Sequence, residues 1–343
     1  MKLLKGKNPM GAVGTVRSFM NVVKDIDFDE VRDRAEQAPR TLIVATSEAL
    51  SEDAVGQLFG AGSRDGIERR TWRDGDTVDV SRWDVIVVYD PEGQGLLDTV
   101  RKAIGPGADA VVFFLAGPGQ SARNAVDALR AEITSTLPAL APAFGRFYPE
   151  WRPDAVRAII DETSKANAQF ALVSNVSTVI PIVGNLMAVG ADLIVLTKNQ
   201  VMMCYKIAAA HDHDLGNQFA IIRELTPVVG AGFLWRTIAR EATAMIPLAA
   251  GTIPKVAIAF AGTMAVGRAA DYYYRFGSKP SKSQLAEFRK SALQLASKLP
   301  VIGDDALAAG MKGSKGKETT TTRPLDATAT STTETETQPL DRD

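Results

Sequence analysis

The first half of the chain alternates between short, continuous apolar runs and segments whose apolar residues recur at helical spacing. The runs predict buried strands at 41–46, 84–89 and 109–115, and a less apolar edge strand at 68–72. The intervening segments predict helices at 51–59, 95–104 and 121–134, the first of them capped by Ser51. Short buried strands separated by helices are typical of a parallel sheet covered on both faces. We therefore expect residues 41–135 to form a small α/β module of three or four strands, Rossmann-like or G-domain-like.

Helical spacing dominates the second half of the chain, from residue 153 to about residue 300. A short phrase occurs there twice, at 178–184 and at 244–251, and each copy places a proline and a glycine within a long apolar segment. Proline ends or kinks a helix, and a glycine close by allows a tight turn. This half is therefore expected to be an all-α domain of apolar helical hairpins, whose corner residues are Pro181, Gly184, Pro247 and Gly251.

The remaining segments have distinct compositions. Residues 1–40 are expected to form basic amphipathic N-terminal helices, one of them between Gly11 and Val23. Residues 136–152, rich in proline and aromatic residues, are expected to link the two domains. Ser281 and Gln284 match a reciprocal capping box at the start of a further helix. Residues 312–343 are rich in threonine, lysine and glutamate and poor in apolar residues, so we expect a disordered tail over 301–343.

Charge and cysteine content narrow the range of functions. Lysine and arginine number 39, and aspartate and glutamate 40, so net charge gives no reason to expect nucleic acid as a partner. Residues 1–24 carry five basic residues and no acidic one, which suits attraction to an anionic membrane surface. The single cysteine, Cys204, fits a reducing compartment and lies among apolar residues, as an inert thiol would. Residues 1–5 lack the apolar core of a signal peptide, so membrane insertion is expected to use internal segments.

Nucleotide-binding motifs are incomplete in the α/β module. A P-loop needs a glycine-rich loop and a lysine after the first strand, because backbone donors and the lysine hold the phosphates. Residues 47–53 contain neither and include three acidic residues. The glycines between Gly60 and Gly66 only approximate a dinucleotide-binding fingerprint, since their spacing differs and no buried strand precedes them. We therefore expect no catalytic phosphoryl transfer and no cofactor.

Two further clusters have both a functional and a structural interpretation. Asp90 and Gly93 follow the strand at 84–89 and are similar to the D-x-x-G turn of small GTPases, in which the aspartate supports magnesium. No N-K-x-D motif follows the strand at 109–115, so an ordinary turn is the favoured interpretation. His211 and His213, each followed by an aspartate, could ligate a metal only from an unwound helix end. A solvated helix C-terminus is favoured instead, and no catalytic residue is predicted.

Several short motifs in the second half resemble a known bacterial family. They are the Ile-Pro phrase at 180–184, the segments at 227–230 and 246–247, Arg236 and Arg240, and the segment at 263–273. In this order, over about residues 160–277, they resemble the YcjF-type domain of unknown function. That domain occurs in inner-membrane proteins and behind Era-like or dynamin-like GTPase domains. The resemblance implies membrane-associated helical hairpins partnered with a G-domain-like module, which would here be degenerate.

These patterns lead to one preferred function and two alternatives. Residues 166–191 carry no charge, yet polar residues and Pro181 interrupt them, which suits re-entrant hairpins or buried helices better than a simple span. The preferred hypothesis is a non-enzymatic protein on the cytoplasmic face of the bacterial inner membrane, with a pseudo-GTPase-like module acting as scaffold or regulator. Its expected partners are membrane lipid and either another protein or a second copy. The alternatives are a soluble, cytoplasmic two-domain regulator of protein interactions and a non-standard nucleotide switch near Asp90.

Overall fold

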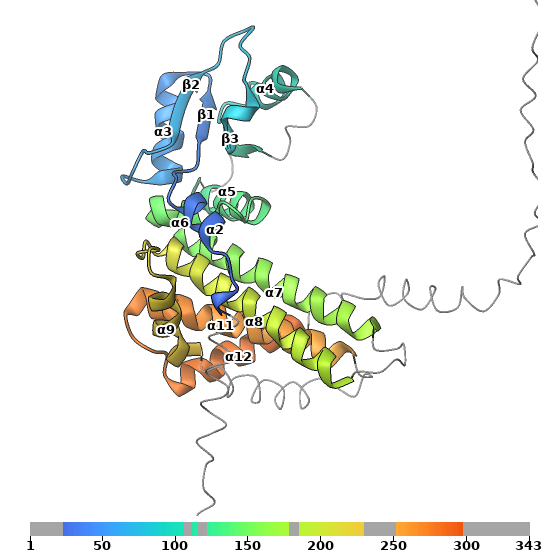
Figure 1. Ribbon diagram of the computed structural model, residues 1–343. Coiled ribbons are helices and arrows are strands. Elements are labelled where there is room, and N and C mark those ends of the chain that lie inside the picture. Colours follow the sequence, from blue (N-terminus) through green and yellow to red (C-terminus); the bar gives the residue numbers. More distant parts are fainter. Residues whose placement is uncertain (1–22, 106–110, 116–121, 178–184, 230–251, 298–343) are drawn as a thin grey trace, which may run out of the picture. The chain divides into compact units, whose positions relative to one another are not determined.

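The computed structural model describes residues 23–105, 111–115, 122–177, 185–229 and 252–297 (Figure 1). The first half contains four strands, β1 (Thr41–Ala45), β2 (Ile67–Thr71), β3 (Val85–Tyr89) and β4 (Val112–Leu115). Its helices are α2 (Asp29–Ala35), α3 (Glu48–Phe59), α4 (Leu96–Ile104) and α5 (Ala122–Thr136), and a short 3-10 helix, η1, covers Val80–Arg82. The α/β alternation expected from the apolar pattern is therefore confirmed.

The four strands form one parallel sheet in the order β2-β1-β3-β4. Thr41 of β1 lies opposite Ile67 of β2 on one side and Val85 of β3 on the other. Every residue of β1 and β3 is buried, whereas β2 is at the edge and carries exposed charged residues. The continuous apolar runs thus mark the two central strands, because both of their faces are covered.

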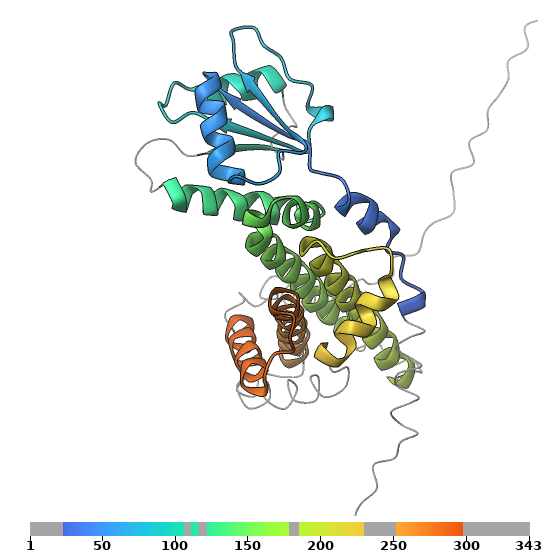
Figure 2. The same ribbon diagram turned by 90° about the vertical axis from the view of Figure 1, so that its left-hand side faces the viewer.

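Helices cover both faces of this sheet. On one face, alternate residues such as Ile43 and Val87 pack with α3 and α5. On the other face, neighbours such as Leu42 and Ile86 pack with α4. Figures 1 and 2 show α3 and α4 on opposite sides of the strands. The order of strands reverses between β1 and β3, so the loops after these two strands leave the same edge of the sheet in opposite directions.

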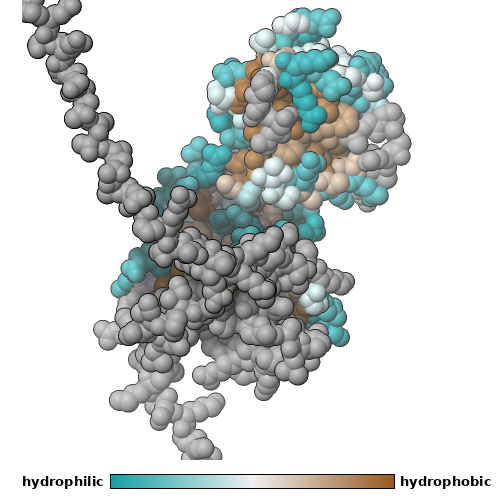
Figure 3. Space-filling view, turned by 90° about the vertical axis from the view of Figure 1, so that its right-hand side faces the viewer, coloured by the Kyte–Doolittle hydropathy of each residue, from teal (hydrophilic) through white to brown (hydrophobic). Residues whose placement is uncertain are grey.

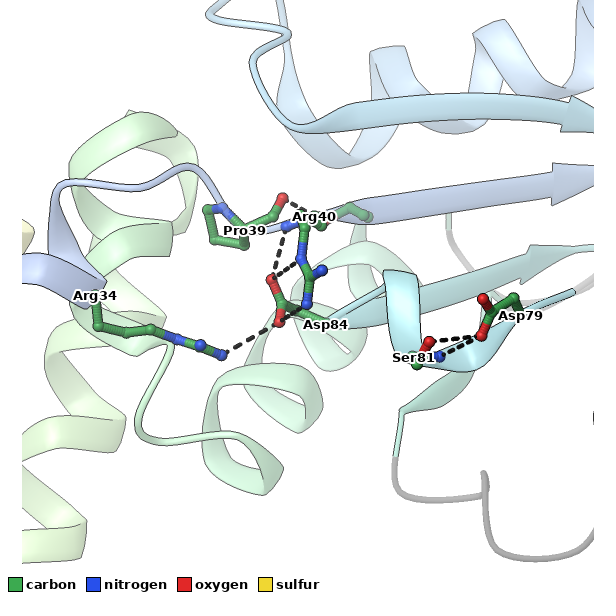
Figure 4. Close-up of polar contacts among 7 residues, drawn as sticks. Arg34, Pro39, Arg40, Asp79, Ser81 and Asp84 are labelled. Atoms are coloured by element: carbon green, nitrogen blue, oxygen red, sulfur yellow. Dashed lines mark hydrogen bonds and ion pairs between the residues drawn. The ribbon is translucent and has the colours of Figure 1, made fainter.

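A charged cluster holds the opposite, amino edge of the sheet (Figure 4). Asp84, just before β3, accepts hydrogen bonds from the backbone N–H of Arg40 at 3.0 Å and from the Arg40 Nε at 3.3 Å. Arg34 of α2 donates to the same carboxylate at 3.2 Å. Burial alone would raise the pKa of Asp84, but the hydrogen bonds from Arg40 and the charges of both arginines hold this pKa below its ordinary value. The cluster joins α2 to the starts of β1 and β3.

The segment expected to link two domains is instead a buried part of the core. It contains α6 (Ala141–Phe147) and the short helix η2 (Pro149–Trp151). Phe144, Tyr148 and Trp151 are fully buried and belong to the same cluster as β1, β3, α3 and α5. The Trp151 indole N–H also donates to the carbonyl of Leu58 at 2.8 Å. The aromatic residues suggested a junction, but they complete the core on this face of the sheet: Trp151 stacks on Phe59, and Tyr148 contacts Phe59 edge-on.

The second half is rich in helices, as predicted. It contains α7 (Arg152–Ser177), α8 (Asn185–Ala210), α9 (Gln218–Val229), α11 (Thr252–Phe276) and α12 (Lys282–Ala296), and the long helices α7, α8 and α11 lie alongside one another (Figures 1 and 2). Asn199 donates to Asn167 at 2.7 Å, and Lys206 donates to Glu162 at 3.2 Å, so α8 runs antiparallel to α7. The third helix, α11, joins them through Thr263, whose hydroxyl accepts from Asn167 and from Gln200.

Of the two helix caps predicted from the sequence, the structure confirms one and contradicts the other. The capping box is confirmed, because Ser281 and Gln284 exchange both expected hydrogen bonds at the start of α12. The expected cap Ser51 is wrong: α3 begins one turn earlier, where Ser47 accepts from the Leu50 N–H, and Ser51 lies inside the helix. The following expectations lie outside the described residues: the corner residues Pro181, Gly184, Pro247 and Gly251, the tail at 301–343, and the N-terminal helix except its last residue, the buried Val23.

Candidate functional site

The turn after β3 holds the two residues that the sequence singled out. Asp90 is 4% exposed, and its two carboxylate oxygens accept from the backbone N–H groups of Gln94 at 2.9 Å and Leu96 at 3.0 Å. Gly93 adopts φ 68°, a left-handed conformation that favours glycine. Asp90 therefore caps the start of α4 within its own turn, as in the structural interpretation of this motif. Its carboxylate is engaged by the backbone rather than turned outward.

The turn after β1 offers little to a phosphate. Ser47 caps α3, and Glu48 follows it in the first turn of that helix. A phosphate at a helix N-terminus is stabilised by free backbone donors and destabilised by carboxylates. Here the Ser47 hydroxyl oxygen accepts a hydrogen bond from the Leu50 N–H at 3.2 Å, and Glu48 adds a negative charge. Among the described residues, the turn after β1 therefore lacks the glycine-rich loop and the lysine of a P-loop.

A polar contact between α3 and β3 escaped the sequence analysis. The Tyr89 hydroxyl, at the end of β3, donates to Asp53 of α3 at 2.9 Å. The side-chain N–H₂ of Gln57 donates to the same carboxylate at 2.7 Å and to the Tyr89 hydroxyl at 3.2 Å. Burial and the hydrogen bond to Asp53 raise the pKa of Tyr89. The three side chains satisfy one another, so they fix α3 against the sheet.

The two histidines contact different parts of the protein. His211, which follows α8, has a side chain that is 5% exposed, and its Nε2 lies 2.9 Å from the Asp271 carboxylate of α11. His213 packs on the ring of Tyr274 with centroids 4.4 Å apart, and burial lowers the pKa of His213. Within the described ranges, no three histidine, cysteine or acidic side chains converge as metal ligands do. The expectation of a solvated helix end is wrong for His211, whose partner lies 60 residues away in the sequence.

The end of α8 is tied to α6 and to the start of α7. The Arg152 Nε donates to the carbonyl of Ala210 at 2.8 Å and to that of Gly145 at 3.1 Å. Arg146 donates to the carbonyl of His213 at 2.8 Å and pairs with Asp212 at 3.2 Å. Asp212 itself has φ 61°, the only left-handed residue other than glycine in the described chain. The histidine segment therefore forms a fixed joint between the helices and the core below the sheet.

The other end of the α7–α8 pair exposes large apolar side chains. Val173 of α7 is 66% exposed and Ile194 of α8 is 45% exposed. Both lie on the same side of the Asn167–Asn199 hydrogen bond, about 9 Å and about 8 Å beyond it at 1.5 Å per residue. Lys165 is the last charged residue of α7. This end of the pair, here called the apolar end and defined by Val173 and Ile194, thus exposes two large apolar side chains, and Asp192 of α8 is two residues from Ile194.

The hydropathy of the helices and of the surface bears on contact with a membrane. Among the described residues, no helix combines the length and the apolar character needed to cross a membrane. Figure 3 shows apolar surface, in brown, on the α/β module as well. Cys204 lies on the inner face of α8 and is buried, and burial raises the pKa of its thiol to about 12. That thiol is therefore protonated and inert at neutral pH, as its apolar neighbours indicated.

Comparison of the chain with protein-family models, with curated proteins and with solved structures finds no match.

Proposed function

We propose that this protein is a non-enzymatic scaffold or regulator that associates with a membrane through its helical half. In this proposal the α/β module is a degenerate, G-domain-like unit that presents a surface to a protein partner. The helices form Pro/Gly-cornered hairpins like those of the YcjF-type family, and the apolar end of α7 and α8 contacts lipid. The observation that carries the proposal is the exposure of Val173 and Ile194 beyond the last charge of α7.

The cost of exposing apolar surface supports the proposed lipid contact. Large apolar side chains exposed close together can mark a surface that another apolar phase or protein covers. Fully burying a valine or isoleucine side chain is worth about 1.5–3 kcal/mol. Two such side chains at one end of a helix pair supply a modest but measurable contribution to binding a bilayer interface. The basic N-terminal residues 1–24 add electrostatic attraction to anionic lipid.

The described turns at the carboxyl edge of the sheet support the proposed non-enzymatic role. Ligands of open α/β sheets bind where the strand order reverses, which is here between β1 and β3. Asp90 and Ser47 at this position hydrogen-bond to their own turns, and Glu48 disfavours phosphate. A nucleotide switch is therefore the weaker alternative. Binding of a fluorescent guanine nucleotide to the full chain, and its loss in Asp90→Ala, would favour that alternative.

Vesicle flotation with the full-length protein tests the membrane contact. The double variant Val173→Ser/Ile194→Ser is compared with Leu295→Ser, which removes another apolar side chain, 42% exposed, from α12. We expect the double variant to bind anionic vesicles about tenfold more weakly, a loss of about 1.4 kcal/mol, and Leu295→Ser to bind like the wild type. Equal binding by all three proteins contradicts a contact at the apolar end. No binding by any of them favours the soluble regulator.

A further inference from the structure

A pocket of about 450 Å³ lies where the start of α7 meets the ends of α8 and α11. Arg152, His211, Asp271, Tyr274 and Arg275 contribute its polar and aromatic lining, and Pro149, Pro153 and Phe276 complete its walls. This volume lies within the range of small-molecule sites, which are mostly apolar with a few convergent polar groups. We refer to it as the His211 pocket. It is separate from the carboxyl edge of the sheet, where the sequence first suggested a ligand.

Arg152 supplies the pocket with a fixed positive charge. Its Nε donates to the carbonyls of Gly145 and Ala210, which fixes the direction of the guanidinium plane. In the described part of the chain no carboxylate lies within ion-pair distance of this arginine, and the terminal nitrogens make no hydrogen bond. Burial lowers the pKa of Arg152, and the charge of Asp212 partly opposes that effect. A half-buried guanidinium with no carboxylate within ion-pair distance among the described residues is stabilised when an anion binds beside it.

The His211–Asp271 pair supplies an oriented imidazole. Nε2 of His211 lies 2.9 Å from the Asp271 carboxylate, and the ring stacks on Tyr274 with centroids 5.8 Å apart. A carboxylate bound to one ring nitrogen fixes the orientation of the ring. The other nitrogen, Nδ1, makes no hydrogen bond to a described residue, so it is available to a ligand as a donor when protonated.

Charge at the mouth of the pocket also favours an anion. Arg275 is 54% exposed, and one of its nitrogens lies 3.6 Å from the second oxygen of Asp271. Asp271 is the only acidic residue in the lining, against two arginines and one histidine. The net charge of the lining is therefore positive even when His211 is neutral. Two guanidinium groups and an imidazole around one pocket match the oxygens of a phosphate group.

We propose that the His211 pocket binds the phosphate group of a small, soluble phosphate monoester. Arg152 and Arg275 hold the phosphate oxygens, His211 donates one further hydrogen bond, and Tyr274 and the two prolines contact the organic remainder. Arg152 also ties α6 to α8, so the ligand stabilises the joint between the helices and the core of the α/β module. The site does not depend on membrane association.

A phospholipid is the other source of the same chemistry. His211 is 17 residues from Ile194 along the α8 direction, which is about 26 Å at 1.5 Å per residue. A membrane that contacts the apolar end therefore lies far from the pocket. Of the arguments for the pocket, only this one depends on the proposed membrane contact. The phosphate of a soluble molecule reaches the pocket without that restriction.

Isothermal titration of the full-length protein with phenyl phosphate tests the site, with inorganic phosphate as a second probe. We expect both to bind, and phenyl phosphate to bind more tightly because its ring contacts the apolar walls. Arg275→Gln and His211→Asn should each weaken binding at least tenfold. Arg223→Gln removes an exposed arginine of α9 that does not line the pocket and should leave binding unchanged. Arg152→Lys keeps the charge but loses the planar fork, so it too should weaken binding.

Three outcomes overturn the proposal. The first is no heat of binding for phenyl phosphate at about 10 mM, a concentration at which a specific site would be occupied. The second is an equal loss in Arg223→Gln and Arg275→Gln, which indicates a general charge effect. The third is binding to phosphatidic acid vesicles that depends on Arg275 without binding of phenyl phosphate, which assigns the pocket to lipid. Thermal unfolding of each variant shows whether it is folded, and Arg275→Gln, at an exposed position, keeps the test valid if Arg152→Lys unfolds.

Discussion

Gly145 of α6 packs directly against Ala210, the last residue of α8. A methyl group built on Gly145 would lie 2.8 Å from the Ala210 Cβ and 3.1 Å from its Cα and carbonyl oxygen. Two of these atoms are backbone atoms of Ala210 and the third is its Cβ, so none of them can move aside as the end of a flexible side chain would. The close approach also brings the carbonyls of both residues within reach of the same Arg152 nitrogen.

Gly145→Ala should destabilise the protein because it separates α6 from α8. We expect a loss of about 1–3 kcal/mol in the free energy of unfolding, as for other overpacked contacts. Gly56→Ala is the matched control, since Gly56 lies inside α3 and a methyl group there would meet nothing within 4 Å. The control should gain about 0.5–1 kcal/mol from helix propensity. Denaturant unfolding of both variants measures the difference, and similar stabilities would contradict this packing.

Asp84→Asn should weaken the amino edge of the sheet in a way that depends on pH. The carboxylate accepts hydrogen bonds from Arg34 and Arg40, and removing its charge is expected to cost about 1–3 kcal/mol at pH 7. The pKa of Asp84 is lowered on folding, so this contribution is present above the unfolded value of 3.8 and is lost as the pH falls below it.

Thermal unfolding of the Asp84→Asn variant and of the wild type between pH 7 and pH 3 checks this expectation. The two melting temperatures should converge toward the acid end of the series. A constant difference would mean that Asp84 acts through shape rather than charge.

Asp161→Asn should have the opposite effect. Burial raises the pKa of Asp161 in α7, although the charges of Lys165, Arg157 and Arg268 oppose the shift. A raised carboxyl pKa means that the ionised form destabilises the fold above that pKa and that this cost disappears below the unfolded value of 3.8. The variant should therefore melt at a higher temperature than the wild type at pH 7, and the gain should shrink toward pH 4. A lower melting temperature at pH 7 would show that the ionised carboxylate is stabilising.

Cys204 should resist thiol reagents in the native protein. Burial raises the pKa of its thiol to about 12, so almost none is thiolate at pH 8. Reaction with a chromogenic disulfide reagent should be slow at pH 8 and should become rapid and stoichiometric in denaturant. Fast native labelling would indicate that α8 opens at this position. A Cys204→Ala variant measures the background of the assay.

The parts of the fold that could be predicted are those encoded by neighbouring residues. The central strands β1 and β3 were recognisable because Val44 and Val87 lie in runs buried on both faces. The capping box at Ser281 needs only four consecutive residues. The predicted cap at Ser51 lies one turn after the observed cap, Ser47, because the pattern of apolar residues alone does not fix the first turn of a helix.

The candidate sites were harder to predict because their contacts join distant parts of the chain. His211 pairs with Asp271, and Arg152 binds the carbonyl of Ala210, 58 residues away. No local spacing encodes either contact. Asp90 was found because its turn follows a strand, yet its role as a cap depends on where its two oxygens point. Residue type identifies candidates, whereas geometry decides what they bind.

Trp151 has a consequence for how the two halves of this protein can be inherited. Its ring stacks on Phe59 and Phe144, its indole N–H binds Leu58, and the next residue, Arg152, begins α7. A recombination event that cut the gene near codon 135 would separate the sheet from the side chains that fill its core. A cut after codon 151 would separate Arg152 from the Gly145 carbonyl. We therefore expect that the α/β module cannot be exchanged between proteins without the segment up to Arg152. Substitutions on the two sides of this contact are expected to occur together during evolution.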